Sequence, residues 1–114
     1  MEDEKLLNEL FTEIDNILDY FTEVKIDGIA ACKSKSSFSP EELEALHKLI
    51  ITKTGRQALA KVLKDYGESN MCQTLSYIDG DRGVKTLELV NADTGEPIAD
   101  GMLHEYYCLF RQDQ

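Results

Sequence analysis

The strongest constraint on the fold is the spacing of apolar side chains in the first 22 residues. Leucine, isoleucine and phenylalanine recur there at steps of three and four residues, which places them in one stripe along a helix. The stripe consists of Leu6, Leu7, Leu10, Phe11, Ile14, Ile17, Leu18 and Phe21. The pattern therefore predicts an amphipathic helix over residues 2–22, whose apolar face packs within its own domain.

A second helix start is marked by the stretch FSPEEL. Ser39 has the side chain of an N-cap, Pro40 suits the first helical position, and Glu42 completes a capping box. The helical spacing is interrupted at residues 52–55 and then resumes as far as Gly67, which we interpret as the glycine that ends the helix. The region is thus predicted to form either one kinked helix or two consecutive helices.

The remaining segments have patterns typical of strands. Asp27-Gly28 between two short apolar runs predicts either a hairpin turn or a plain loop with one edge strand. From Met71 onward, runs rich in β-branched and aromatic residues alternate with turn residues; the runs are QTLSYI, VKTLELVN and MLHEYYCLF. The predicted fold class is α+β: an N-terminal amphipathic helix, one kinked or two consecutive helices, and a three- to four-stranded antiparallel β-meander packed on the helices.

The composition is typical of one globular domain spanning residues 1–114. No stretch approaches the roughly 20 apolar residues of a membrane helix, and the acidic N-terminus lacks the basic start of an export signal. We therefore expect a cytoplasmic protein with no membrane partner. The three cysteines form no CxxC pair and are expected to be reduced thiols that either serve packing or have no particular role; they are Cys32, Cys72 and Cys108.

The net charge of −10 is unevenly distributed along the chain. Residues 1–23 carry −7, residues 24–64 carry +4, and residues 65–114 carry −7. Binding to a nucleic-acid duplex needs clustered Lys and Arg to displace counterions from phosphates. The balance argues against direct nucleic-acid binding and favours a partner protein with a basic surface.

Two short stretches resemble metal sites but fail on spacing. An EF-hand loop starting at Asp79 in DGDRG would need a ligand and then a glycine at the positions of Gly83 and Val84. We therefore interpret DGDRG as a hairpin turn in which Gly80 or Gly83 is left-handed. In HEYYC, a strand would separate His104 and Cys108 by about 13 Å, too far for one zinc ion.

No catalytic residue is predicted, because no local sequence marks an activated nucleophile. No metal or cofactor is predicted either. The chain is accordingly expected not to be an enzyme.

The leading hypothesis is a small acidic protein–protein interaction module of the inhibitor or immunity type. Both faces of the last predicted strand are largely apolar, which suggests an exposed patch used by a partner or by a homodimer formed through the sheet. Carboxylates would steer a basic partner, and aromatic side chains would anchor it. The predicted contact residues are Glu9, Asp15, Asp19, Asp79, Asp81, Tyr106 and Tyr107.

The sequence also predicts two other sites, a ligand pocket and an anion site. The alternative function is a small-ligand-binding or weakly catalytic domain, with a pocket between helices and sheet lined by Tyr77, His104, Tyr106 and Phe110. A helix beginning at Thr54 would also direct free N–H groups at an anion, a site formed by Lys53, Thr54, Gly55 and Arg56.

Overall fold

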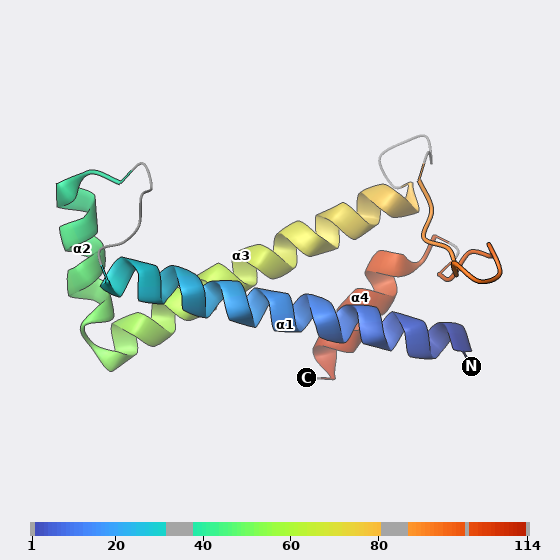
Figure 1. Cartoon of the computed structure of the whole chain (residues 1–114), viewed down its shortest axis with the longest axis horizontal. Coiled ribbons are helices and arrows are strands. Elements are labelled where there is room, and N and C mark those ends of the chain that lie inside the picture. The colour runs from blue at the N-terminus through green and yellow to red at the C-terminus, as the bar shows by residue number, and fades with distance from the viewer. Residues whose placement is uncertain (1, 32–37, 81–86, 100, 114) are drawn as a thin grey trace. The chain divides into compact units, whose positions relative to one another are not determined.

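The computed structural model describes residues 2–31, 38–80, 87–99 and 101–113, and the regular elements within these ranges are all helices. Within these ranges the helices are α1 (Glu2–Ala30), α2 (Pro40–Ile50), α3 (Lys53–Asp79) and α4 (Leu103–Gln112) (Figure 1). The same ranges hold no β-strand, only an isolated antiparallel bridge between Val90 and Pro97. The predicted α+β fold with its β-meander is therefore wrong.

The chain divides into two compact units. Unit 1 comprises Met1–Asp15 and Glu68–Gln114, and unit 2 comprises Asn16–Gly67. The boundary falls inside both long helices, so α1 and α3 each contribute one segment to each unit. The single domain over residues 1–114 stays a prediction.

The core of unit 2 explains why α1 is longer than predicted. Ile26 and Ile29 of α1 are buried with Ile50 of α2, where the expected hairpin at Asp27-Gly28 would lie. Partly buried side chains complete the cluster; they are Leu46, Leu59, Ala60 and Leu63. Burial of two isoleucines on one helical face outweighs the local turn preference of an Asp-Gly pair. The hairpin prediction is wrong up to Ala31, and Cys32 lies outside the described residues.

The capping box at the start of α2 is confirmed. The Ser39 N–H donates to Glu42 Oε1 at 2.7 Å, and the Glu42 N–H donates to Ser39 Oγ at 3.1 Å. Of the two predicted arrangements, the structure has two consecutive helices, because the chain turns at residues 51–52. The Gly55 N–H donates to Thr52 Oγ1 at 3.0 Å, so Thr52 caps α3, which begins at Lys53 rather than at Thr54.

Gly67 does not end a helix, contrary to the prediction. Helix α3 continues through it to Asp79, and a Cβ atom at Gly67 would stand 2.5 Å from Leu18 Cδ2. The glycine is used for close approach of the Leu18 side chain within unit 2. Within the described part of DGDRG, Gly80 has a left-handed backbone, with φ 90°, as predicted for one glycine of this stretch. It follows a helix rather than a hairpin strand, and Asp81 and Gly83 lie outside the described residues.

The segments predicted as strands in unit 1 are mostly helical. QTLSYI lies in α3, and MLHEYYCLF enters α4 at Leu103. Leu103 and Tyr107, four residues apart, are the buried pair of α4, so its period is that of a helix. The other buried apolar side chains of unit 1 are Leu7, Phe11, Ile14, Leu75 and Ala99. The predicted homodimer through a sheet is wrong as well, because the described residues form no sheet.

Two glycines of unit 2 offer a matched test of this packing. A Cβ atom at Gly55 would lie 1.8 Å from the Leu49 carbonyl oxygen, whereas one at Gly28 would meet nothing within 4 Å. We expect Gly55→Ala to lower the free energy of unfolding by about 1–3 kcal/mol, because backbone must move. Gly28→Ala should raise it by up to about 1 kcal/mol. Urea unfolding followed by circular dichroism measures both, and equal effects would contradict the packing described.

Candidate functional site

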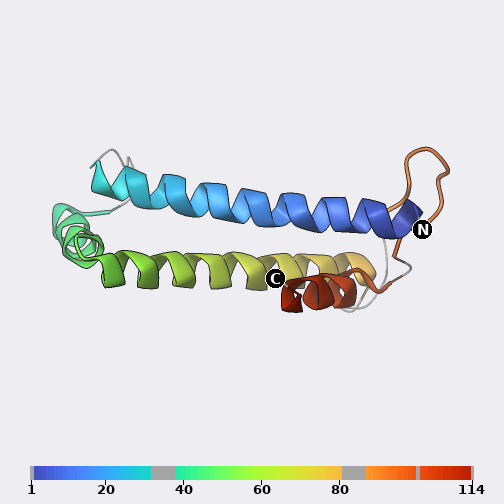
Figure 2. The ribbon, with the colours of Figure 1, turned by 90° about the horizontal axis from the view of Figure 1, so that it is seen from below.

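Helix α4 is held at its N-terminus by a carboxylate from α3. Asp79 accepts hydrogen bonds from the Leu103 N–H at 3.0 Å and the His104 N–H at 2.8 Å, and its Oδ2 lies 2.5 Å from His104 Nδ1. Met102, at the N-cap position, supplies no side-chain cap. Asp79 thus satisfies free N–H groups of α4 across space, and its side chain is only 3% exposed. In Figures 1 and 2, α4 lies beside the C-terminal part of α3.

The bonds to Asp79 favour its charged form. Burial by itself would raise the pKa of Asp79, but the backbone and imidazole bonds from His104 and the Leu103 N–H hold this pKa below its ordinary value. The carboxylate therefore stays ionised where it complements the positive end of α4.

The other end of α4 is fixed by Arg111. Its guanidinium pairs with Asp15 of α1 and with Glu68 of α3, and all three side chains are half-buried. Burial alone would lower the pKa of Arg111, but the bond to Asp15 and the charges of both carboxylates raise it. One cation thereby joins all three helical segments of unit 1.

Aromatic packing fills the space between these two polar anchors. The Phe11 ring lies 5.4 Å from the Tyr107 ring and 5.6 Å from the Phe110 ring, between centroids, in tilted geometry. Tyr107 is 1% exposed, and burial raises the pKa of its hydroxyl to about 12. Tyr107 Oη and Arg111 Nε are buried polar atoms without a hydrogen-bond partner among the described residues.

A groove of about 470 Å³ lies between α1 and α4 in unit 1. Its apolar lining comes from Leu7, Phe11, Ile98, Tyr106, Leu109 and Phe110. Its polar lining consists of the amide Asn8 and the carboxylates Asp3, Glu4 and Asp113. Among the described residues that line the groove, none is basic. We call this site the α1–α4 groove; it combines an apolar wall with a set of negative charges.

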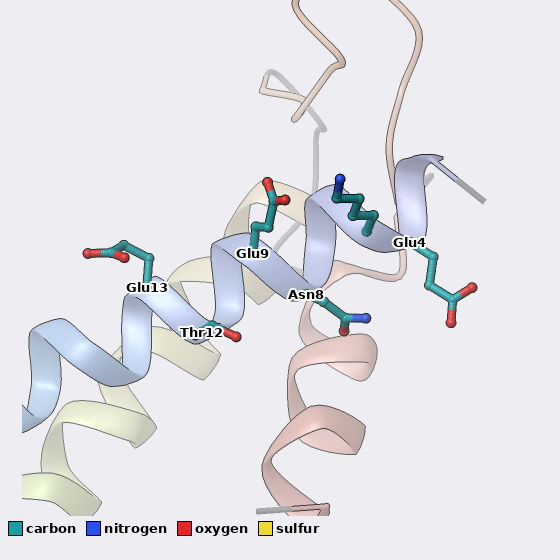
Figure 3. A pocket seen from close by; sticks show the side chains of 6 residues that line it. Glu4, Asn8, Glu9, Thr12 and Glu13 are labelled. Atoms are coloured by element: carbon teal, nitrogen blue, oxygen red, sulfur yellow. The ribbon is translucent and has the colours of Figure 1, made fainter.

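A second hollow, of about 680 Å³, is a less suitable site. It is lined by Glu4, Lys5, Asn8, Glu9, Thr12 and Glu13, all from α1. Figure 3 shows its labelled side chains projecting from this one helix. Because no second element supplies a wall, the hollow offers little burial to a ligand.

The predicted partner-binding residues differ in exposure. Glu9 is exposed on α1, and Tyr106 is 40% exposed in the α1–α4 groove. Asp15, Asp79 and Tyr107 are instead engaged in the interior contacts of unit 1 described above. In unit 2, Asp19 lies 2.5 Å from Lys64 Nζ. Asp81 lies outside the described residues.

The predicted ligand-pocket residues are only partly brought together. Tyr106 and Phe110 both line the α1–α4 groove, whereas Tyr77 and His104 do not. The wall of the groove that α1 supplies was not predicted, although Leu7 and Phe11 belong to the predicted apolar stripe. A helical period for residues 103–112 would have predicted the wall on the α4 side, because it places residues 106, 109, 110 and 113 on one side of the helix.

The predicted anion site lies at the start of α3. The Gly55 N–H is used by Thr52, and Arg56 lies 2.6 Å from Asp27 and 3.8 Å from Glu23. Lys53 and Thr54 are exposed beside them. These internal partners reduce what the helix terminus offers to an anion, and the anion site stays a prediction.

The helical structure around His104 and Cys108 removes one argument against a metal site at these two residues. His104 and Cys108 lie in a helix, so the strand-based distance used to exclude zinc does not apply. Among the residues that the structure describes, no three His, Cys, Asp or Glu side chains are grouped to hold a metal ion. Within the same ranges, no helix is both long enough and apolar enough to cross a membrane.

Comparison with known proteins adds no relationship: no family model, curated protein or solved structure matches the chain. The site must therefore be interpreted from its own chemistry.

The cap at Asp79 gives a stability prediction. Asp79→Ala leaves two N–H groups of α4 without their acceptor, and we expect the free energy of unfolding to fall by on the order of 3 kcal/mol. Asp93→Ala, at an exposed carboxylate of the same unit, is the control and should change it by less than about 0.5 kcal/mol. Thermal or urea unfolding measures both, and equal losses would contradict the role given to Asp79.

The same carboxylate predicts a pH dependence. The pKa of Asp79 is lower in the folded chain than its ordinary value of 3.8, so its charge stabilises the fold fully above that value. This stabilisation is lost as the pH falls through the folded-state pKa. The difference in free energy of unfolding between the unaltered chain and Asp79→Asn should therefore shrink between about pH 5 and pH 2. A difference that stays constant over this range would contradict the assignment.

Proposed function

We propose that the chain is a protein–protein interaction module whose α1–α4 groove binds a basic, partly apolar segment of a partner protein. The observation that carries the proposal is the composition of the groove. An apolar side chain of the partner would pack against Phe11, Leu109 and Phe110, while a Lys or Arg on the same segment would reach the carboxylates of Asp3, Glu4 and Asp113. We propose no catalytic role.

The distribution of charge supports a basic partner. Unit 1 contains fifteen acidic and four basic residues, a net charge of −11, whereas unit 2 contains seven acidic and eight basic residues, a net charge of +1. The unit that contains the groove thus carries the chain's excess of negative charge. Such a field accelerates the encounter with a positively charged surface and disfavours acidic competitors.

The exposed apolar side chains supply the anchor that charge alone does not. Leu109 is 56% exposed and adjoins the half-exposed Tyr106 at the α1–α4 groove. A few side chains buried near the centre of an interface carry most of its affinity, and tyrosine is enriched among them. A segment that covers them would gain apolar burial, and the surrounding carboxylates would set its orientation.

The finer role that we propose is inhibition of a target that uses a basic surface. Proteins that bind nucleic acid need such surfaces to contact phosphates, so they are the partner class that fits best. An acidic module seated on that surface would exclude the nucleic acid by occupying the same positive charges. We place this interaction in the cytoplasm.

A pair of synthetic peptides tests the proposal. The first is a fluorescein-labelled amphipathic helix of Lys and Leu, and the second has every Lys replaced by Glu. We expect fluorescence anisotropy to show binding of the Lys/Leu peptide alone, with an association rate that falls steeply as salt rises. An association rate indifferent to salt, or equal binding of both peptides, would contradict the proposal.

Matched variants assign the binding to the α1–α4 groove. Leu109→Ser, and the pair Asp3→Asn with Asp113→Asn, should each weaken binding of the Lys/Leu peptide by about tenfold or more. The controls lie in unit 2: Ile51→Ser removes an 84% exposed apolar side chain, and Glu41→Gln with Asp65→Asn removes two exposed charges. Equal weakening by the controls would place the binding elsewhere.

A second candidate function is the binding of a small cationic amphiphile in the same groove. Its volume lies within the range typical of small-ligand sites, roughly 300–1,000 Å³. Tyr106 and Phe110, two residues of the predicted ligand pocket, line it. A long-chain alkylammonium salt tests this alternative: saturable binding of the salt, lost in Leu109→Ser and without binding of the Lys/Leu peptide, would favour a ligand-binding domain.

A further inference from the structure

Two cysteines far apart in the sequence come into contact in unit 1. Cys72 Sγ of α3 lies 3.2 Å from Cys108 Sγ of α4, across a separation of 36 residues. Both are free thiols; Cys108 is exposed and Cys72 is half-buried. The sulfur atoms of a disulfide are about 2.0 Å apart, so closing the bond requires a movement of about 1.2 Å. Rotation of the two side chains about their χ1 bonds can shorten such a distance.

We infer that Cys72 and Cys108 form a modification site, a dithiol that a low-molecular-weight disulfide such as oxidised glutathione converts to an intramolecular disulfide linking α3 to α4. The site lies outside the α1–α4 groove, and the inference does not depend on the proposed function. Thiols that serve only packing have no need to meet, whereas the sulfur atoms of these two free cysteines lie 3.2 Å apart.

The conversion takes two exchange steps. The exposed Cys108, as thiolate, attacks one sulfur of oxidised glutathione, whose S–S bond breaks and releases one glutathione thiolate. Cys72 then gives up its proton and attacks the Cys108 sulfur, which forms the protein disulfide and releases the second glutathione. The two protons lost by the cysteines end on the two glutathione thiols, so the protein dithiol is oxidised and glutathione disulfide is reduced.

The surroundings fix the order of attack. Burial, together with the contact and charge of Cys108, raises the pKa of Cys72 to about 11, so Cys72 supplies little thiolate to solvent. Cys108 is accessible and meets the reagent first. Cys72 serves as the resolving thiol because the attacked sulfur is already in contact with it.

The experiment uses the full chain carrying Cys32→Ser, so that the third cysteine cannot compete. The folded protein is equilibrated with oxidised and reduced glutathione, alkylated, digested with trypsin and analysed by mass spectrometry. Cleavage after Lys64, Arg82, Lys85 and Arg111 leaves the two cysteines on separate peptides. We expect these two peptides to be linked, and the intact protein to be lighter by two hydrogen atoms than its reduced form.

Single variants test the roles of the two thiols. With Cys72→Ser added, Cys108 should accumulate as a stable adduct with one glutathione, because no resolving thiol is present. With Cys108→Ser added instead, the remaining Cys72 should react at least tenfold more slowly. Persistence of the glutathione adduct when both cysteines are present, or equal reactivity of the two single thiols, would overturn the assignment.

The equilibrium constant with glutathione provides a second measurement. Because linkage is reciprocal, folding raises the equilibrium constant for forming the disulfide by the same factor by which the disulfide raises the equilibrium constant for folding. For a loop of this length, that factor is roughly a hundredfold or more. The constant should therefore be larger by about this factor in native buffer than in concentrated urea. A ratio near or below one, or failure of the folded chain to oxidise, would overturn the inference.

Discussion

The attachment of α4 to the neighbouring segments of α1 and α3 is the contact on which the described features of unit 1 depend. A helix of ten residues is too short to be stable in water by itself, so tertiary contacts must hold it. Asp79 binds its first N–H groups, Arg111 pairs its last turn with two carboxylates, and Tyr107 is buried against Phe11 between them. Both polar anchors are charged groups with restricted access to water, and both are paired, as burial of charge requires.

This attachment sets the rotation of α4 about its axis, and the rotation assigns different tasks to its faces. One face places Tyr106, Leu109 and Phe110 in the groove with α1. Another directs His104 and Cys108 toward Asp79 and Cys72 of α3. Because neighbouring positions on a helix are about 100° apart, a change of register by one residue would remove the groove and the thiol contact together. The anchors at the two ends therefore determine both the α1–α4 groove and the contact between Cys72 and Cys108 through one geometric constraint.

The sequence predicts the helices with strong local signals and fails where the decisive contacts are distant. The apolar stripe from Leu6 to Phe21 and the capping box at Ser39 depend on residues a few positions apart. The structure has a helix at the first, α1, and the capping box at the start of α2. The run from Met102 to Phe110 is short, aromatic and apolar at nearly every position, so a period of two and a period of 3.6 fit it about equally well. What selects the helix is the cap from Asp79, more than twenty residues away, and the burial of Leu103 and Tyr107. No local pattern contains that information.

The candidate site shows the same division between local and distant information. Tyr106 and Phe110, which were predicted to share a strand face in a ligand pocket, line the α1–α4 groove from a helix. Asp79 and Asp15, which were predicted to meet a partner, instead bind His104 and Arg111 within unit 1. A carboxylate in a sequence does not reveal whether its counter-ion lies in the same molecule. The charge count of each unit is more informative, because pairing cannot remove a net charge. With four basic residues in unit 1, pairing one to one within that unit leaves eleven of its fifteen carboxylates uncompensated. That excess, present on the unit whose groove exposes leucine and tyrosine, is what a cationic partner would neutralise.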